Sequence, residues 1–242
     1  YDEVIETYTT GLLRADAMLG RGMTFYRTRE FGLALEDFSK VAAEYPSSMS
    51  AERAQYMRAM CTYWTGDSTE AVRLCGDFVK QFPESKLLPD VLYWLGEYEF
   101  NGGNFEESEK AFLQLVEKFP KSPMADDALL WAGQAAARRR EFVRSVEILT
   151  RLVTGYPESV HMAEARFVQA ESFSELGKYA EAIVIFDEVI NKYPESDFVG
   201  PAWGRKGDCQ FQLGSEDPKR YESSIESYSV VAKISSLSLD LV

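Results

Sequence analysis

The chain has 242 residues, of which 45% are hydrophobic and 27% are charged, and its formal net charge at pH 7 is −13. Such an acidic chain is a poor candidate for nucleic-acid binding, because that affinity depends largely on Lys and Arg side chains that neutralise phosphates. Anionic membrane surfaces are disfavoured for the same reason, and the sequence has no apolar run approaching the roughly 18 residues of a transmembrane helix.

The first residues match the end of a repeated pattern. Tyr8 and Val4 precede Tyr45 and Val41 by one period of 37 residues. We therefore expect residues 1–14 to be the end of a preceding repeat in a longer or processed protein. The alternative is a divergent N-terminal capping helix.

The next segment, residues 15–199, repeats every 37 residues. The repeated signature is an aromatic residue, Pro, any residue and Ser, and its prolines are Pro46, Pro83, Pro120, Pro157 and Pro194. A fixed period of about 20–50 residues is typical of stacked repeats, in which each unit packs mainly on its neighbours. We therefore predict five 37-residue repeats over residues 15–199 in one solenoid.

Each repeat is predicted to contain two helices. A small residue that would let two helix backbones approach closely recurs at Gly22, Ala59, Gly96, Gly133, Ala170 and Gly207. A core-type column contains Phe38, Cys75, Phe112, Leu149 and Phe186. A second apolar column follows three residues later, so both lie on one helical face. The period leaves no room for strands.

Turn residues separate the two helices of a repeat. One column, where a left-handed C-terminal cap would end the first helix, contains Gly66, Gly103, Gly177 and Gly214. Arg29 and Arg140 occupy this column in repeats one and four. The second helix ends before the Pro, which cannot continue it, and the recurring Ser is a good N-cap for the next helix.

The last segment, residues 200–242, is predicted to be a lengthened sixth repeat. Tyr221 follows its counterpart Tyr179 by 42 residues, which is the period of 37 plus five. The extra residues lie within the polar stretch 215–220, which contains Pro218. We expect this insertion to lengthen one loop and to leave the stack intact.

Residues that carry chemistry are sparse. Cys61, Cys75 and Cys209 match no metal motif; we expect Cys75 to be buried core, with a Cys61–Cys75 disulfide as the alternative. The single histidine, His161, lies in a link without the cluster that a metal site needs. No phosphate-binding loop and no nucleophile with a matching base are present. We therefore predict no enzymatic activity, no cofactor and no metal.

The one basic cluster is 138–140, at the turn of the fourth repeat. Its three arginines would interact favourably with the C-terminus of the preceding helix through the helix dipole. The alternative is a contact with an anion or a partner.

One stripe of the first helices mixes large apolar and charged side chains. Spacings of three and four residues place its members on one helical face, offset from the core face. Aromatic residues and Met are enriched at protein interfaces. The alternative is that the Trp and Met side chains pack between adjacent repeats. We predict a partner-binding groove formed by Met57, Met60, Trp64, Trp94, Glu97, Trp131, Gln134 and Glu171.

These columns resemble the tetratricopeptide repeat (TPR), over nearly the whole chain from Ala15 to about Leu237. The aromatic-Pro-x-Ser variant is similar to repeats in bacterial envelope proteins, such as outer-membrane assembly lipoproteins of the BamD type and periplasmic TolA-binding cell-division coordinators. The family's Trp near the start of the first helix survives only as Trp203. The resemblance implies an all-α, right-handed solenoid of stacked antiparallel helix pairs, whose first helices line a concave groove.

Together these observations predict a non-catalytic scaffold for protein–protein interaction. Its aromatic residues would anchor a protein or peptide, and its carboxylates would select apolar partners of neutral or basic character. The resemblance implies a place in the bacterial periplasm or at the periplasmic face of the outer membrane, in envelope or outer-membrane assembly. Two alternatives stay open: a cytoplasmic TPR adaptor or regulator, and the non-catalytic repeat region of a larger enzyme.

Overall fold

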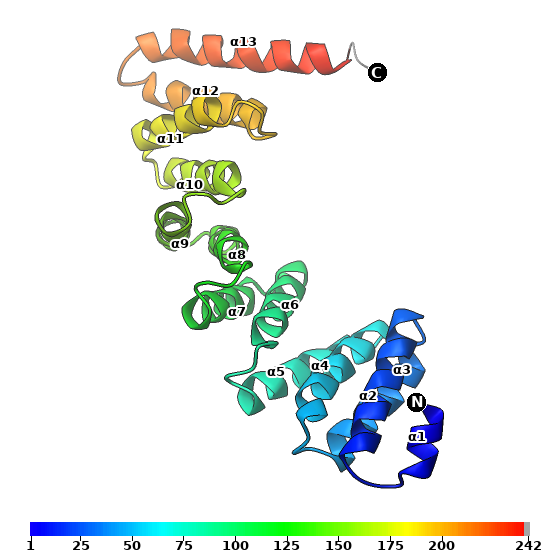
Figure 1. Ribbon diagram of the computed structural model, residues 1–242. Helices are drawn as coiled ribbons and strands as arrows, with labels where there is room; N and C mark the ends of the chain where they lie inside the picture. The colour runs from blue at the N-terminus through cyan, green and yellow to red at the C-terminus, as the bar shows by residue number, and fades with distance from the viewer. Residues whose placement is uncertain (240–242) are drawn as a thin grey trace. The chain divides into compact units, whose positions relative to one another are not determined.

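The computed structural model describes residues 1–239, and the described residues form helices joined by short turns, without any strand (Figure 1). The helices are α1 (Asp2–Thr7), α2 (Leu12–Arg27), α3 (Phe31–Glu44), α4 (Met49–Trp64), α5 (Ser68–Gln81), α6 (Leu88–Asn101), α7 (Phe105–Lys118), α8 (Ala125–Arg138), α9 (Phe142–Gly155), α10 (Met162–Glu175), α11 (Tyr179–Lys192), α12 (Val199–Leu213) and α13 (Lys219–Leu239). The predicted all-α class is confirmed.

The chain divides into two compact units, Tyr1–Leu95 and Gly96–Val242, and the boundary falls inside α6. Within each unit, helices that follow one another in sequence pack together, such as α2 with α3 and α8 with α9. First helices of successive repeats also contact one another, as α2 and α4 do in the first unit and α8 and α10 in the second. Each unit is therefore a stack of helix pairs.

The small-residue column lets the two helices of a pair approach closely. In the first unit, a Cβ atom at Gly22 would lie 2.7 Å from the Phe38 ring. In the second, a Cβ atom at Gly133 would lie 2.6 Å from Leu149. Phe38 and Leu149 are fully buried. A larger residue in the small column would thus displace the core side chain opposite it.

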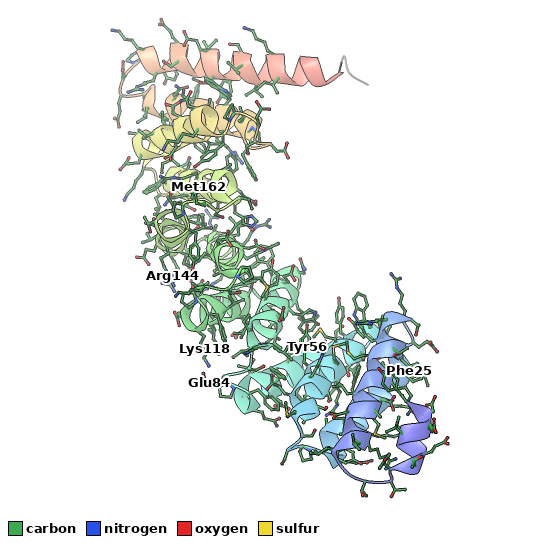
Figure 2. All side chains as sticks on the ribbon, viewed as in Figure 1. Phe25, Tyr56, Glu84, Lys118, Arg144 and Met162 are labelled. Carbon is green, nitrogen blue, oxygen red and sulfur yellow. The ribbon has the colours of Figure 1, made fainter. Side chains whose placement is uncertain are left out.

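The core of the first unit gathers around the apolar faces of α2, α3 and α4. Its buried members include Met18, Phe38 and Val41, and partly buried Phe25 and Tyr56 pack against them (Figure 2). Cys61 and Cys75 are buried and unbridged, so the alternative of a disulfide is wrong. Burial raises the pKa of each of these two thiols to about 12, which makes them poor nucleophiles.

The turns follow the predicted left-handed caps at three of the four glycines of this column, and its two arginines adopt the same conformation. Gly66, Gly103 and Gly177 have φ of 100°, 79° and 73°, and Arg29 and Arg140 adopt φ of 63° and 62° in the same column. Such a φ is unfavourable for a residue with a Cβ atom. The prediction is wrong for Gly214, whose φ is −60°. The lengthened link changes this turn, and Gly214 instead lies against the Tyr221 ring.

The recurring Ser does not cap the helix directly in four of the repeats. Ser85 Oγ accepts a hydrogen bond from the Leu87 N–H at 2.9 Å, and α6 begins one residue later. Its hydroxyl group donates to Glu52 Oε1, on the preceding first helix α4, at 2.6 Å. Ser159 donates to Asp126 Oδ2 in the same way at 2.6 Å. Ser85 and Ser159 therefore shape their links and join them to the preceding repeat.

Candidate interaction surfaces

In the first unit, two of the predicted groove residues are buried. Met57 and Met60 are each 6% exposed, and Met57 belongs to the core around Phe38. These two side chains pack inside the unit and are not offered to a partner. Their position corresponds to the alternative in which the Met residues fill the space between helices.

Trp64, at the end of α4, is the exposed member of the predicted set in this unit, with 56% of its surface accessible. Its ring stacks on Phe31 at a centroid distance of 5.7 Å, and Phe31 meets the edge of Tyr26 at 5.4 Å. On its other side, Trp64 lies 5.3 Å from Tyr63, which lies 5.3 Å from Trp94. The five rings form a continuous row, of which Trp64 is the most accessible predicted residue.

A hollow of about 440 Å³ lies beside this row, and we call it the Trp64 hollow. Its lining residues are Tyr26, Arg27, Arg29, Phe31 and Trp64. The three aromatic rings make the hollow mainly apolar. Arg27 and Arg29 are exposed, and their guanidinium groups have no hydrogen-bond or ion-pair partner among the described residues.

In the second unit, Trp131 of α8 is half-buried. Its ring meets Phe100 edge-on at 4.8 Å and lies nearly parallel to Phe112 at 6.2 Å. In the first unit, Trp94 contacts Tyr63 in the equivalent way, one period earlier. The Trp column therefore packs on an aromatic residue near the end of the preceding first helix and keeps part of each ring accessible.

The polar members of the predicted set connect successive first helices of the second unit. Gln134 Nε2 of α8 donates to Glu164 Oε1 of α10 at 2.7 Å. Arg205 Nε of α12 donates to Glu171 Oε1 of α10 at 3.0 Å. Burial raises the pKa of the Glu171 carboxyl group, and Arg205 opposes this shift. Burial and the nearby Asp127 carboxylate raise the pKa of Glu97.

A second hollow of about 440 Å³, which we call the Glu175 hollow, lies in this unit. It is lined by Ala137, Arg138, Arg140, Phe142, Val168, Glu171, Ser172 and Glu175. Five of these residues follow the five of the Trp64 hollow by three periods of 37, or 111 residues. The two hollows therefore occupy the same place in repeats one and four.

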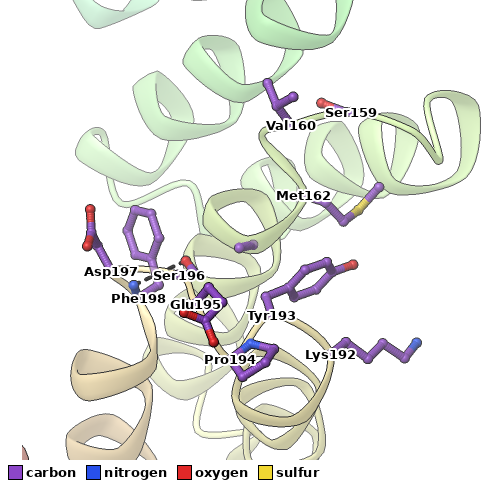
Figure 3. A pocket seen from close by; sticks show the side chains of 11 residues that line it. Ser159, Val160, Met162, Lys192, Tyr193, Pro194, Glu195, Ser196, Asp197 and Phe198 are labelled. Atoms are coloured by element: carbon purple, nitrogen blue, oxygen red, sulfur yellow. Dashed lines mark hydrogen bonds between the residues drawn. The ribbon is translucent and has the colours of Figure 1, made fainter.

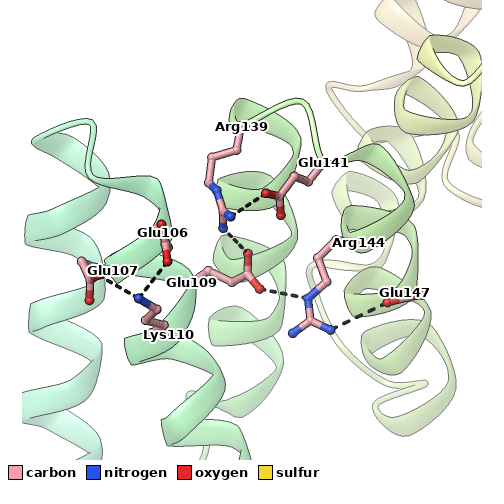
Figure 4. Close-up of polar contacts among 8 residues, drawn as sticks. All are labelled: Glu106, Glu107, Glu109, Lys110, Arg139, Glu141, Arg144 and Glu147. Carbon is pink, nitrogen blue, oxygen red and sulfur yellow. Dashed lines mark hydrogen bonds and ion pairs between the residues drawn. The ribbon is translucent and has the colours of Figure 1, made fainter.

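The arginines of the basic cluster have separate roles. Arg138 lies over the Phe100 ring at 5.9 Å. Arg139 pairs with the buried Glu109 at 3.0 Å, and Arg144 pairs with the other oxygen of Glu109 at 3.0 Å (Figure 4). Arg140 carries the left-handed turn. The ion-pair role of Arg139 depends on a long-range contact that local sequence could not indicate.

A third hollow, of about 570 Å³, lies between two successive links of the second unit (Figure 3). One wall comes from 159–163 and the other from 192–198. Val160 at its edge is 88% exposed. We did not predict this hollow, although the aromatic-Pro-x-Ser signature marks both of its walls.

The described residues offer no group of three or more His, Cys, Asp or Glu side chains that could hold a metal ion. His161 Nε2 lies 3.7 Å from Asp127 Oδ1, at the start of α10. None of the helices in the described part of the chain has the length and apolarity that a membrane span requires.

Three segments of the chain match known families. Residues 93–160 and 164–196 match two models of the tetratricopeptide repeat. The resemblance to tetratricopeptide repeats is confirmed. Residues 14–96 match a family described as outer membrane lipoprotein. No curated protein is significantly similar to this chain in sequence.

Several solved structures share this TPR fold. A tetratricopeptide repeat protein from Parabacteroides merdae is 15% identical, with 90% of this chain and 79% of that chain covered and a TM-score of 0.61. The C-terminal part of a TPR protein from Cytophaga hutchinsonii is 12% identical, with 88% and 87% covered and a TM-score of 0.62. A MamA fragment from Desulfovibrio magneticus is 14% identical, with 76% and 94% covered and a TM-score of 0.58. At these identities the likeness shows the fold alone.

Proposed function

We propose that this protein is a non-catalytic scaffold that binds a protein or peptide along its first helices. The observation that carries the proposal is the polar contact between successive first helices in the second unit. Gln134 bonds to Glu164 and Glu171 pairs with Arg205, so α8, α10 and α12 lie side by side through polar side chains. The Glu171 side chain stays 34% exposed beside this contact, so its carboxylate is accessible to a partner.

Each unit offers an aromatic anchor, and the second unit adds carboxylates. Trp64 in the first unit and Trp131 in the second keep accessible ring surface, and aromatic residues dominate binding hot spots. In the second unit, Glu97, Glu171 and Glu175 add negative charge, which favours neutral or basic partner segments and speeds their association. We therefore propose that the second unit selects partners by charge.

We further propose that the protein acts in the bacterial envelope, in outer-membrane assembly or a related process. Support comes from the match of residues 14–96 to the outer membrane lipoprotein family. The proposed place is the periplasm or the periplasmic face of the outer membrane.

The test is an affinity capture from a bacterial envelope extract, followed by mass spectrometry. The bait is the full chain, compared with a Glu97→Gln, Glu171→Gln double variant. Glu181→Gln is the matched control, because Glu181 is exposed on the second helix α11 of the same unit. We expect the control to retain the captured partner, and the double variant to lose most of it at low salt. Equal capture by a folded double variant would contradict the proposal.

A further inference from the structure

We infer that the Trp64 hollow binds an acidic peptide segment that carries an aromatic or branched aliphatic side chain. This inference rests on the proposed function, because Trp64 belongs to the surface proposed above. It names the ligand chemistry at one place on that surface, and this chemistry is opposite in charge to that proposed for the second unit.

The walls of the hollow favour an apolar side chain. Phe31 and Trp64 lie nearly parallel at 17°, with Tyr26 at 65° to Phe31, so rings from α2, α3 and α4 converge on one hollow. Trp64 remains 56% exposed despite these contacts. A further apolar group placed there would bury ring surface that now faces solvent, which is favourable.

The charges of the hollow favour a carboxylate. Arg27 and Arg29 are its only charged lining residues, and both guanidinium groups lack a partner among the described residues. Elsewhere in the same unit, Arg21 and Arg73 are each paired with carboxylates. Guanidinium groups bind carboxylates through charge-assisted and often bidentate hydrogen bonds.

The equivalent hollow of the second unit contains carboxylates that the Trp64 hollow lacks. There, Arg138 and Arg140 share the hollow with the carboxylates of Glu171 and Glu175. In the first unit, the positions of these carboxylates are occupied by Met60, which is buried, and Trp64. The lining of the Trp64 hollow thus has two arginines and no carboxylate, and an acidic ligand would supply one.

The aromatic walls alone would also suit a cation, since ring faces attract ammonium and guanidinium groups. Two unpaired arginines at the rim oppose this, because they repel a second positive charge. The geometry therefore favours a segment in which an apolar side chain is flanked by Asp or Glu.

The test is a titration of the full chain, followed through the tryptophan indole N–H signals in a nitrogen–proton NMR spectrum. The probe is the peptide acetyl-Glu-Asp-Phe-Asp-Glu-amide, and the comparison peptide replaces its acidic residues by Lys. We expect the acidic peptide to shift the Trp64 signal, with an affinity that falls as salt is added. The Lys peptide should leave the Trp64 signal unchanged.

Matched variants separate binding from folding. In calorimetric titrations, Arg29→Gln and Trp64→Ala should each weaken binding of the acidic peptide by about tenfold or more, as removal of an interface anchor does. Arg140→Gln is the control for Arg29→Gln, because it changes the same repeat position in the other unit, and it should leave the affinity unchanged. If Trp64→Ala fails to fold, Arg29→Gln carries the test, because Arg29 is exposed at a turn.

Three outcomes would overturn the inference. The first is an unchanged Trp64 signal at millimolar acidic peptide. The second is a Lys peptide that shifts this signal as much as the acidic one. The third is a Trp64 signal that shifts with protein concentration alone, which would mean that a second copy of the chain fills the hollow. None of these outcomes affects the affinity capture from an envelope extract. That experiment removes carboxylates of the second unit and tests the proposed function separately.

Discussion

The Trp64 hollow and the Glu175 hollow occupy the same position in two repeats, yet they present different chemistry. Each is built from the end of a first helix, a turn with an arginine at positive φ, and the aromatic start of a second helix. The far wall is Trp64 in one and Glu175 in the other. The repeat therefore fixes the shape of a surface hollow, while single exposed positions determine which ligand the hollow suits.

The core positions of the same two repeats are constrained in a different way. Phe38 in one and Leu149 in the other are fully buried, and each lies against a glycine of the facing helix. Packing at these sites tolerates a change of shape among large apolar residues but not a loss of volume. Because the packing is kept from repeat to repeat while exposed residues vary, one fold can present different binding surfaces.

The largest expected effect is a loss of stability in either unit when this packing is removed. Phe38→Ala should cost about 3–5 kcal/mol and Leu149→Ala about 2–5 kcal/mol, because each leaves a cavity in a fully buried site. Denaturant unfolding followed by circular dichroism would measure both. Since repeat arrays unfold in parts, each variant should broaden the transition. An unchanged unfolding transition for one variant would show that Phe38 and Leu149 do not have equivalent roles in packing.

The next effect concerns the buried Glu109, the charged member of a repeat column that is otherwise apolar. The other members of this column are Leu35 and Val72 in the first unit and Val146 and Ile183 in the second. Arg139→Ala combined with Arg144→Ala should destabilise the protein by about 2 kcal/mol, because it leaves a buried carboxylate unpaired while the lost arginines are partly exposed.

Glu109→Leu, which adopts the residue type of the first unit, should be close to neutral for stability. Thermal melting of both variants checks this pair of expectations. A severe loss of stability in Glu109→Leu would show that the ion cluster is required for the fold of this unit.

A smaller effect is expected at the two turns that carry the hollows. Arg29→Gly and Arg140→Gly should each stabilise the protein by about 0.5–1 kcal/mol, because glycine relieves the left-handed backbone more than it adds entropy to the unfolded chain. Gly103→Ala, at the same column, should destabilise by a similar amount, since open space surrounds it and only its φ opposes a Cβ atom. Denaturant midpoints that fall in the two Arg→Gly variants, or rise in Gly103→Ala, would contradict this explanation of the turns.

The smallest effect is a pH dependence that belongs to the second unit. Glu97 lies one period after Met60, and burial raises the pKa of its carboxyl group in the folded protein. The folded state therefore holds this proton more tightly than the unfolded chain does. The stability that this proton provides is present below the unfolded pKa and is lost as the pH rises through the folded pKa.

Glu97→Gln should accordingly be more stable than the unmodified protein near pH 7 and equal to it near pH 3. Melting temperatures across this range would show the converging curves. Met60→Leu is the matched control in the first unit, and it should show no pH dependence relative to the unmodified protein.

Much of the fold could be predicted from the sequence, because the residues that pack the helix pairs recur at the same positions in successive repeats. The small column, the Phe column and the Pro-containing links placed the helix pairs, and the left-handed turn at Gly66 followed from its column. The predicted left-handed turn at Gly214 was wrong, because the longer link of this repeat does not require a positive φ there. The repeat boundaries at 15–199 and 200–242 stay a prediction.

The surface was harder to predict. Helical spacing placed Met60 and Trp64 on one stripe, but one is buried and the other exposed, because the next repeat covers a stripe unevenly along its length. The contact of Arg139 with Glu109 spans 30 residues, and the hollows form between helices of two repeats. Such features depend on tertiary neighbours, so period and spacing alone did not reveal them.

The most direct test of the account is calorimetric titration of the full chain with the acidic Phe peptide and with its Lys counterpart, each repeated with Arg29→Gln and Glu175→Gln. We expect Arg29→Gln to weaken the binding of the acidic peptide alone and Glu175→Gln to weaken the binding of the Lys peptide alone. The two peptides should not compete with each other. Loss of both peptides with one variant, or competition between them, would contradict the claim that equivalent hollows of the two units carry different ligand preferences.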